Sequence, residues 1–315
     1  MARVGLVLGG GGVAGGAWHA AALAALAAAT GWDARAAAVV VGTSAGSITG
    51  GLLRAGVSPA DLYAGAIGSP LSAEGARIQS RVSTAPGSLG GRLLPGRGAP
   101  ANPRLLGALA PWVRRPGVAL AGLLPAGSVD GGFIGARVEE ALGGLTWPTD
   151  PLWIVAVRLA DGRRVVFGRD DVEARLGEAV SASSAVPGLF APVPIGGTRY
   201  VDGGVHSTTN ADLLAGAGLD LVIVSAPMAG EWRALRPHPS ALSRSSARVS
   251  VDREAAALRK AGAQVVVLQP GPDDTPLMDG RAMDPSARKP IAEQARRSLD
   301  AMLARLEPGV LAELS

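Results

Sequence analysis

A strand that runs directly into a glycine-flanked serine constrains this chain more than any other feature of its sequence. Three β-branched residues, Val39 to Val41, precede Gly42-Thr43-Ser44-Ala45-Gly46, and a helix-compatible segment follows. A G-x-S-x-G pattern between a strand and a helix is typical of a nucleophile elbow, a sharp turn that presents a reactive hydroxyl. Gly42 and Gly46 keep side chains out of the space where strand and helix pass closely. A glycine- and serine-rich turn without chemistry is the alternative interpretation.

A glycine loop lies one strand before the elbow. Val4 to Leu8 is a short apolar run typical of a buried parallel strand, and Gly9 to Gly16 separates it from a predicted helix over Ala17 to Ala29. Gly10-x-Gly12-x-x-Gly15 fits a dinucleotide-binding loop, but the acidic residue expected after the second strand is missing. Consecutive glycine amides before a helix can instead form an oxyanion hole. Because parallel strands end at the same sheet edge, we expect loop and elbow to lie side by side.

The order of elements predicts an α/β fold. The first fifty residues read as strand, glycine loop, helix, strand, elbow and helix, which implies a parallel sheet covered by helices. Further strands are predicted over 153–157, 164–167, 198–201, 221–224 and 264–268. Further helices are predicted over 51–68 with a break, 133–143, 173–184, 213–217, 250–261 and 290–306. A polar loop is expected over 237–246.

We expect a single domain over 1–315, because the chain has no internal repeat and no convincing linker. Residues 1–68 hold the glycine loop and the elbow. Residues 69–128, rich in Gly, Pro, Ser and Arg, are expected to form a cap insertion of short helices and loops, either as a plain surface extension or as a lid. The rest of the core is expected over 129–225, and C-terminal helices with one strand over 226–315.

Composition excludes several kinds of site. The chain has no cysteine, so disulfides and thiolate chemistry are excluded, and its three histidines form no metal-binding pair. The net charge of +4 comes almost entirely from arginine, without the basic and aromatic clusters of a nucleic-acid interface. No signal sequence or apolar stretch approaching a membrane span is apparent, which favours a cytoplasmic location. We therefore expect no metal, no cofactor and no nucleic-acid partner.

A serine nucleophile needs a base to accept its proton. His206 and His238 follow Ser44 in the order that α/β-hydrolases use, but the elbow comes too early in the chain for that fold. A carboxylate acting directly is the alternative. Asp202 ends a predicted strand, and Gly203-Gly204 allow a tight turn after it; Asp130-Gly131-Gly132 has the same tripeptide without a credible strand before it. We therefore rank Asp202 above Asp130.

Four ordered motifs together resemble the patatin-like phospholipases over roughly the first 225 residues. They are the glycine loop, the early Gly-Thr-Ser-Ala-Gly, the segment Ala182 to Pro192, and Asp202-Gly203-Gly204. The resemblance implies a three-layer α/β/α fold with a mainly parallel central sheet. It also implies that Ser44 is the nucleophile and Asp202 the general base of a Ser-Asp dyad.

The resemblance further implies an oxyanion hole and a substrate class. The oxyanion donors would be the amides of Gly10, Gly11, Gly12 and Val13, with Gly15 as a motif glycine. The implied activity is hydrolysis of acyl esters of lipids or phospholipids. Transient contact with a membrane surface is also implied, and the oligomeric state is left open. Family members usually carry Lys or Arg where this chain has Ala14. A non-catalytic lipid-binding protein on the same fold is therefore the second hypothesis.

His19 lies on the helix after the glycine loop, and we expect it to pack or hydrogen-bond near the sheet rather than to act in catalysis. Trp18 and Phe190 are expected to pack or to line a pocket. Thr43 and Ser47 flank the elbow and are expected to be turn or capping residues.

Overall fold

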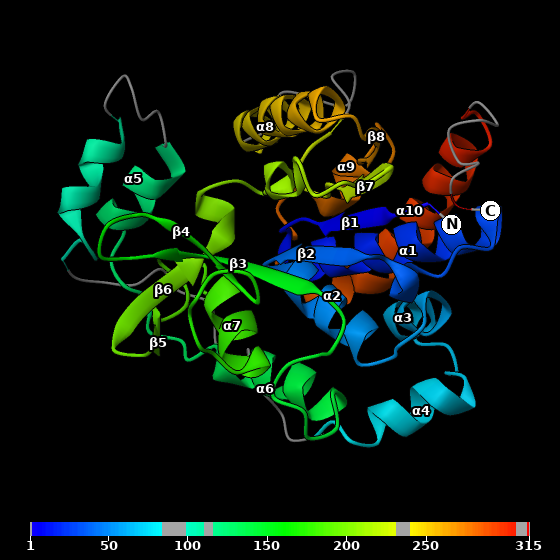
Figure 1. Cartoon of the computed structure of the whole chain (residues 1–315), viewed down its shortest axis with the longest axis horizontal. Coiled ribbons are helices and arrows are strands. Elements are labelled where there is room, and N and C mark those ends of the chain that lie inside the picture. The colour runs from blue at the N-terminus through cyan, green and yellow to red at the C-terminus, as the bar shows by residue number, and fades with distance from the viewer. Residues whose placement is uncertain (1, 84–98, 110–115, 231–239, 307–313, 315) are drawn as a thin grey trace.

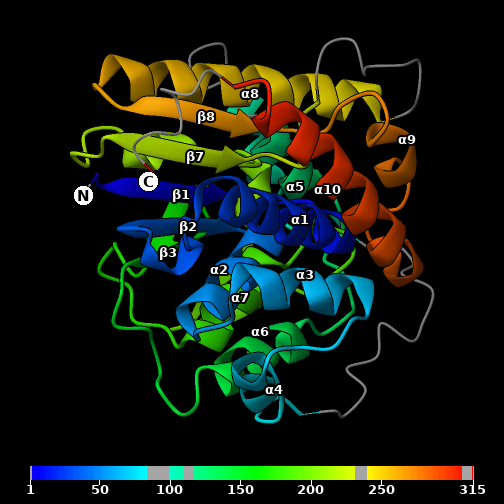
Figure 2. The ribbon, with the colours of Figure 1, turned by 90° about the vertical axis from the view of Figure 1, so that its right-hand side faces the viewer.

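The computed structural model describes residues 2–83, 99–109, 116–230, 240–306 and 314. Its centre is one sheet of eight strands, in the order β5-β6-β3-β2-β1-β7-β8, with β4 paired to β3 (Figures 1 and 2). The strands are β1 (Val4–Leu8), β2 (Val39–Thr43), β3 (Leu152–Arg158), β4 (Arg164–Phe167), β5 (Val193–Ile195), β6 (Thr198–Asp202), β7 (Leu221–Ser225) and β8 (Gln264–Leu268).

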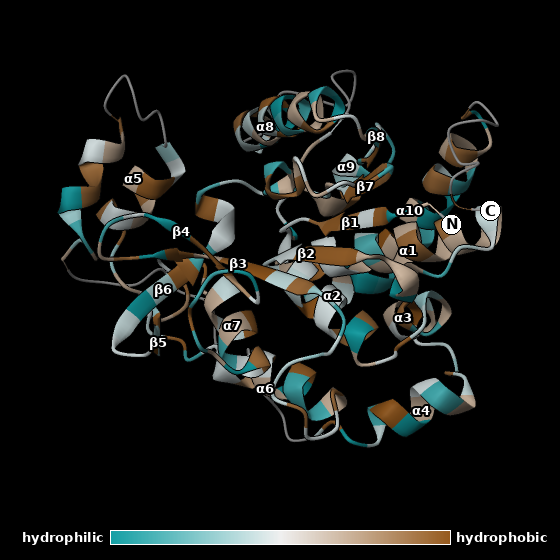
Figure 3. Cartoon of the chain, viewed as in Figure 1, coloured by the Kyte–Doolittle hydropathy of each residue, from teal (hydrophilic) through white to brown (hydrophobic). Residues whose placement is uncertain are grey.

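The predicted parallel sheet is confirmed. Strands β3, β2, β1, β7 and β8 pair in parallel, whereas β4, β5 and β6 form an antiparallel extension at one side. Strands β1, β2 and β7 are buried on both faces, and they form the hydrophobic centre of the molecule (Figure 3). The Asp161-Gly162 turn joins β3 and β4 as an antiparallel hairpin, as its sequence predicts.

Helices cover the sheet on both faces. The α-helices are α1 (Gly12–Thr30), α2 (Ala45–Arg54), α3 (Pro59–Ile67), α4 (Ala73–Gln79), α5 (Pro116–Leu123), α6 (Gly132–Ala141), α7 (Leu176–Ser183), α8 (Ala241–Lys260), α9 (Thr275–Met278) and α10 (Arg288–Leu303). Short 3-10 turns are η1 (Ala34–Ala36), η2 (Pro103–Leu109), η3 (Gly203–Val205), η4 (Ala211–Leu214) and η6 (Pro285–Ala287).

Two hydrophobic clusters account for the three layers. Alternate strand residues such as Leu6, Val40 and Ile154 pack with α1, α2, α3, α6, α7 and α10 on one face. Their neighbours, including Val7 and Val41, pack with α8 and η4 on the other face. Successive side chains of a strand point to opposite faces, so each all-apolar strand supplies both clusters. The layers are therefore α/β/α, as expected.

Among the described residues, α1 is the one helix that is long and apolar enough to cross a membrane, judged by length and composition alone. This corrects the expectation that no apolar stretch approaches a span. Most of α1 is buried, and it packs against α10, α3 and α2. Its apolar character is that of the core helix of a three-layer fold.

Several predicted boundaries were wrong. Helix α8 begins at Ala241, so the loop expected over 237–246 is helical from there; residues 231–239 lie outside the described part. Buried Arg244 explains this start, because it pairs with Asp279 and donates to the carbonyls of Pro227 and Ala229. Sequence periodicity cannot register such tertiary contacts.

Three other elements also differ from expectation. The helix predicted over 213–217 is the short 3-10 turn η4, and the helix predicted over 173–184 begins only at Leu176. Strand β5 was not predicted. It is three residues long and interrupted by Pro194, so no alternating pattern could reveal it.

Segment 69–128 contains α4, η2 and α5, while residues 84–98 and 110–115 lie outside the described part. Leu105 of η2 and Val118 of α5 pack against Val157 of β3 and Val201 of β6, and Val205 joins this cluster. Figure 1 shows α5 at the end of the molecule opposite the two termini, beside β4 and β6. These elements therefore lie next to the segment that follows Asp202.

Candidate active site

Ser44 occupies a strained turn between β2 and α2. Its backbone angles are φ 52° and ψ −119°, and among the described non-glycine residues only Asn210 shares a positive φ. Such strain persists only where the surrounding structure enforces it. Glycine is required beside the turn, because a Cβ at Gly46 would lie 1.8 Å from the carbonyl oxygen of Leu8. The sequence therefore builds the elbow geometry locally.

Two further serines hold this turn. The backbone N–H of Ser44 donates to the Oγ of Ser183 over 2.9 Å, and that Oγ donates to the carbonyl of Val155 over 2.6 Å. The Oγ of Ser47 donates to the carbonyl of Ser44 over 2.6 Å, so Ser47 braces the turn, and α2 has no side-chain cap hydrogen bond at its start. The role of Ser183 was not predicted, because only the fold brings α7 to the elbow.

Asp202 ends β6 and faces the serine. Its carboxylate accepts the N–H of Gly204 over 2.7 Å, and it interacts with the Ser44 side chain. Its own N–H donates to the carbonyl of Ala185 over 3.0 Å. Burial raises the pKa of the Asp202 carboxyl from 3.8 to about 6, although the N–H of Gly204 and the Ser44 side chain oppose the rise. A carboxylate with such a pKa is a stronger base than an exposed one, and it is ionised at neutral pH.

The glycine loop lies beside the elbow, as expected from parallel pairing of β1 and β2. A Cβ at Gly10 would lie 3.4 Å from the Cβ of Ser44. The N–H of Gly10 already donates to the carbonyl of Thr208 over 2.8 Å, so this amide is not available to a substrate. The N–H groups of Gly11, Gly12 and Val13 have no acceptor among the described residues. The oxyanion donor set expected from the sequence is thereby reduced to these three amides.

His19 holds the glycine loop from behind. Its ring nitrogens lie 2.7 Å from the carbonyl oxygen of Gly9 and 2.8 Å from the Oγ of Ser225. Complete burial lowers the pKa of His19 to about 4, so the ring is neutral at physiological pH. His19 is therefore a buried packing residue, and Trp18 and Phe190 are likewise buried in the core.

Ala14 lies in the glycine loop at the position where the resemblance implies a basic residue. Its side chain is only 2% exposed and belongs to the hydrophobic core, so a longer charged side chain has no room without rearrangement. The N–H of Ala14 donates to the carbonyl of Ala282 over 3.2 Å, and a Cβ at Gly12 would lie 2.4 Å from that same oxygen. The C-terminal segment around Ala282 thus packs directly against the glycine loop.

The segment after Asp202-Gly203-Gly204 links the site's motifs to one another. Asn210 adopts φ 55° and its Nδ2 donates to Thr43 Oγ1 over 3.1 Å and to the carbonyl of Ser207 over 2.6 Å. Its Oδ1 accepts from Arg164 over 3.2 Å. The sequence analysis assigned no role to Asn210, although asparagine is enriched at positive φ and a loop asparagine eight residues after Asp202 was a usable signal.

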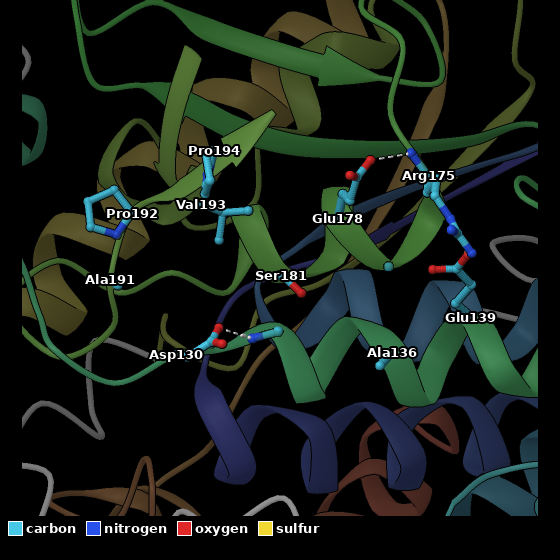
Figure 4. Close-up of a pocket in the computed structure, with 12 residues that line it drawn as sticks. Asp130, Ala136, Glu139, Arg175, Glu178, Ser181, Ala191, Pro192, Val193 and Pro194 are labelled. Atoms are coloured by element: carbon cyan, nitrogen blue, oxygen red, sulfur yellow. Dashed lines mark hydrogen bonds and ion pairs between the residues drawn. The ribbon is translucent and has the colours of Figure 1, made fainter. Parts of the chain in front are cut away.

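The competing Asp130 lies elsewhere. It lines an open groove of about 560 Å³ between α6, α7 and β5, together with Ser181, Pro192 and Val193 (Figure 4). Its carboxylate accepts the N–H of Gly132 over 2.8 Å. Neither Ser44 nor Asp202 lines this groove. The structure therefore keeps Asp130 at the start of α6 and places Asp202 at the serine.

Two histidines, His206 and His238, are the alternative bases that the sequence offers. His206 interacts electrostatically with Asp212, and His238 lies outside the described residues. No group of three or more His, Asp or Glu side chains that could hold a metal ion occurs among the described residues.

The chain matches one protein family over most of its length. A family model described as patatin-like phospholipase matches residues 6–215, which include the glycine loop, the elbow and Asp202-Gly203-Gly204. Among solved structures, VipD from Legionella pneumophila matches with 14% sequence identity and a TM-score of 0.39, over 95% of this chain and 67% of that chain. On the match of the family model, the chain belongs to the patatin-like phospholipase family.

Proposed function

We propose that this protein hydrolyses acyl esters of lipids or phospholipids, with Ser44 as nucleophile and Asp202 as general base. The observation that carries the proposal is the buried Asp202 carboxylate, which interacts with the side chain of Ser44 in its strained turn. A nucleophile needs a base within hydrogen-bond reach, and the strained elbow presents the hydroxyl to it. Family membership supports the lipid acyl hydrolase class.

The proposed reaction has two steps. Asp202 takes the proton of Ser44 Oγ as that oxygen bonds to the acyl carbon, and the carbonyl oxygen becomes an oxyanion. The proton then passes to the departing alcohol oxygen, and an acyl-serine remains. Water, deprotonated by Asp202, attacks the acyl-serine, releases the carboxylic acid and restores the serine hydroxyl. No cofactor enters either step.

The glycine loop is proposed to stabilise the oxyanion. The N–H groups of Gly11, Gly12 and Val13 lie at the start of α1, where the helix dipole also favours negative charge. Each well-placed donor of this kind lowers the barrier by about 3 kcal/mol. Backbone donors do not depend on the side chain at position 14, so the alanine there is compatible with turnover.

Exposed leucines support a lipid substrate. Leu106 and Leu109 of η2 and Leu120 and Leu123 of α5 are 41–56% exposed. Their segment packs beside Val201 and Val205, which flank Asp202-Gly203-Gly204 in sequence. Clustered apolar side chains on a surface mark contact sites for apolar partners. We propose that this segment contacts the acyl chains of substrate or the surface of a membrane.

A fluorophosphonate probe tests the proposed function directly. The wild-type protein should be labelled at Ser44 and should hydrolyse a short p-nitrophenyl ester. Ser44→Ala should lose both properties, whereas Ser47→Ala should still be labelled. Labelling that persists in Ser44→Ala would refute the assignment. An unlabelled wild-type protein that binds lipid vesicles would instead support the non-catalytic alternative.

A further inference from the structure

Glu254 is a buried carboxylate on α8, outside the residues matched by the family model. It is 8% exposed. Its Oε1 accepts from Ser207 Oγ over 2.5 Å, and its Oε2 accepts from Thr209 Oγ1 over 2.6 Å and from the N–H of Ala211 over 2.7 Å. A buried carboxylate is costly unless it is hydrogen-bonded, and these three donors offset that cost.

All three donors belong to one stretch of backbone, residues 207–211, which we call the brace segment. It begins five residues after Asp202. Ser207 Oγ also accepts from the N–H groups of Thr209 and Asn210 over 3.3 and 3.2 Å. Glu254 and these contacts together fix the conformation of the brace segment, including the positive φ of Asn210.

The brace segment contacts each of the three motifs of the site. The carbonyl of Thr208 accepts the N–H of Gly10 in the glycine loop over 2.8 Å. Asn210 Nδ2 donates to Thr43, the residue before the nucleophile, over 3.1 Å. The same Nδ2 lies 3.5 Å from the carbonyl of Gly203, the residue after the base. The glycine loop and the turns beside the nucleophile and the base thus share one support.

Helix α8, which carries Glu254, packs on one face of the sheet and so fixes the position of this residue. Ala247, Val251 and Leu258 of α8 are buried against the strand residues of the second cluster. Glu254 lies in the same buried stripe of the helix, where an apolar residue would serve packing alone. The burial of the carboxylate raises its pKa, and nearby Asp212 raises it further. An acidic residue buried at such a position destabilises the fold unless hydrogen bonds compensate for its burial.

We propose that Glu254 is a positioning residue. Through the brace segment, it holds the glycine loop, the nucleophile and the base in their positions relative to one another. The proposal rests on the proposed hydrolase function for its effect on rate, but not for its effect on structure. Misplacement of reacting groups by about 1 Å can lower a rate about 100-fold. Loss of Glu254 should therefore lower kcat while leaving the lipid-contacting surface and KM unchanged.

Two substitutions test this with one matched control. Glu254→Ala removes all three acceptors, and Glu254→Gln keeps the size but turns one acceptor into a donor. We expect kcat per fluorophosphonate-titrated site to fall about 10- to 100-fold in the first and at least about 5-fold in the second, with KM within about twofold. Val251→Ala shortens a buried α8 side chain and leaves all three hydrogen bonds of Glu254 in place, and it should keep wild-type kcat. A wild-type kcat in Glu254→Gln would overturn the proposal. If Glu254→Ala does not fold, the result for Glu254→Gln is the deciding test.

Hydrogen exchange at the Gly10 amide gives a second readout that needs no activity. This N–H donates to Thr208, so its exchange should be at least about tenfold faster in Glu254→Gln than in Val251→Ala or wild type. Equal protection in all three proteins would overturn the positioning role. If the wild-type protein hydrolyses no ester, the proposed function fails, while the exchange measurement still decides whether Glu254 holds the glycine loop.

Discussion

The backbone N–H of Ser44 and the Oγ of Ser183 are joined by a 2.9 Å hydrogen bond across 139 residues of sequence. Ser183 in turn donates to the carbonyl of Val155 on β3 over 2.6 Å. One hydroxyl thus connects the strained elbow, helix α7 and the central sheet. Because Ser44 adopts a backbone conformation that costs energy, such an anchor helps to keep it there.

Ser183→Ala should destabilise the protein and slow the reaction. It removes the partner of the buried Ser44 N–H, so we expect the free energy of unfolding to fall by about 1 to 3 kcal/mol in urea titration. We also expect kcat for a p-nitrophenyl ester to fall about tenfold, because the elbow relaxes.

Ser184→Ala is the matched control for that change. Ser184 is the next residue and is also buried, but its Oγ has no hydrogen-bond partner among the described residues. Its removal should leave kcat unchanged and stability equal or higher. A loss of activity equal to that of Ser183→Ala would mean that the effect comes from the helix and not from the hydrogen bond.

Asp202→Asn and Asp130→Asn should behave in opposite ways. The first removes the proposed general base, and ester hydrolysis should fall at least about 100-fold. The second changes a carboxylate in a groove that neither Ser44 nor Asp202 lines, and the rate should stay within about twofold of wild type. Steady-state kinetics of the two purified variants decide the point. The reverse pattern would show that the other Asp-Gly-Gly is the functional one.

The pH dependence of kcat/KM should report the ionisation of Asp202. Burial raises the pKa of this carboxyl to about 6, and only its ionised form can accept the serine proton. The rate should therefore fall as pH decreases through about 6, and approach a tenfold loss per pH unit below it. A profile that stays flat down to pH 4 would be incompatible with a base in this environment.

Asp202→Asn should also stabilise the folded protein at alkaline pH. The folded-state pKa of about 6 lies above the ordinary value of 3.8, so the folded protein binds more protons than the unfolded chain between these values. Stability is therefore lost as pH rises through that window, by about 3 kcal/mol in total. Asparagine does not ionise, so the stability of the variant does not decrease in this pH range through the group at position 202.

Denaturant titration at two pH values measures the effect. At pH 8, Asp202→Asn should be more stable than wild type by about 2 to 3 kcal/mol, and below pH 4 the difference should disappear. A variant that is less stable than wild type at pH 8 would show that the carboxylate's hydrogen bonds outweigh its burial.

The sequence alone predicts the parts of the site that depend on local geometry. The elbow needs a strand, a tight turn and two glycines, and all of them lie within eight residues from Val39 to Gly46. The glycine loop and the α/β order are equally local. Parallel pairing then places the loop beside the elbow, because both follow the same ends of neighbouring strands.

The sequence could not predict which long-range contacts hold these parts. Ser183, Asn210 and Glu254 come from α7, the brace segment and α8, and none lies near Ser44 in sequence. For Glu254, the one local signal was an acidic residue in the apolar stripe of a helix, next to Val251 and Leu258. Its partners follow only from the packing of α8 on the sheet.

Local sequence thus determined the chemistry-bearing groups of this protein, namely a strained serine, a glycine loop and a strand-terminal aspartate. Tertiary structure decided which Asp-Gly-Gly faces the serine, which glycine amides are already occupied, and how far burial shifts the pKa of Asp202. The physical reason is that backbone turns are set by residues a few positions apart. Desolvation and hydrogen bonds between distant segments depend instead on the whole packed core.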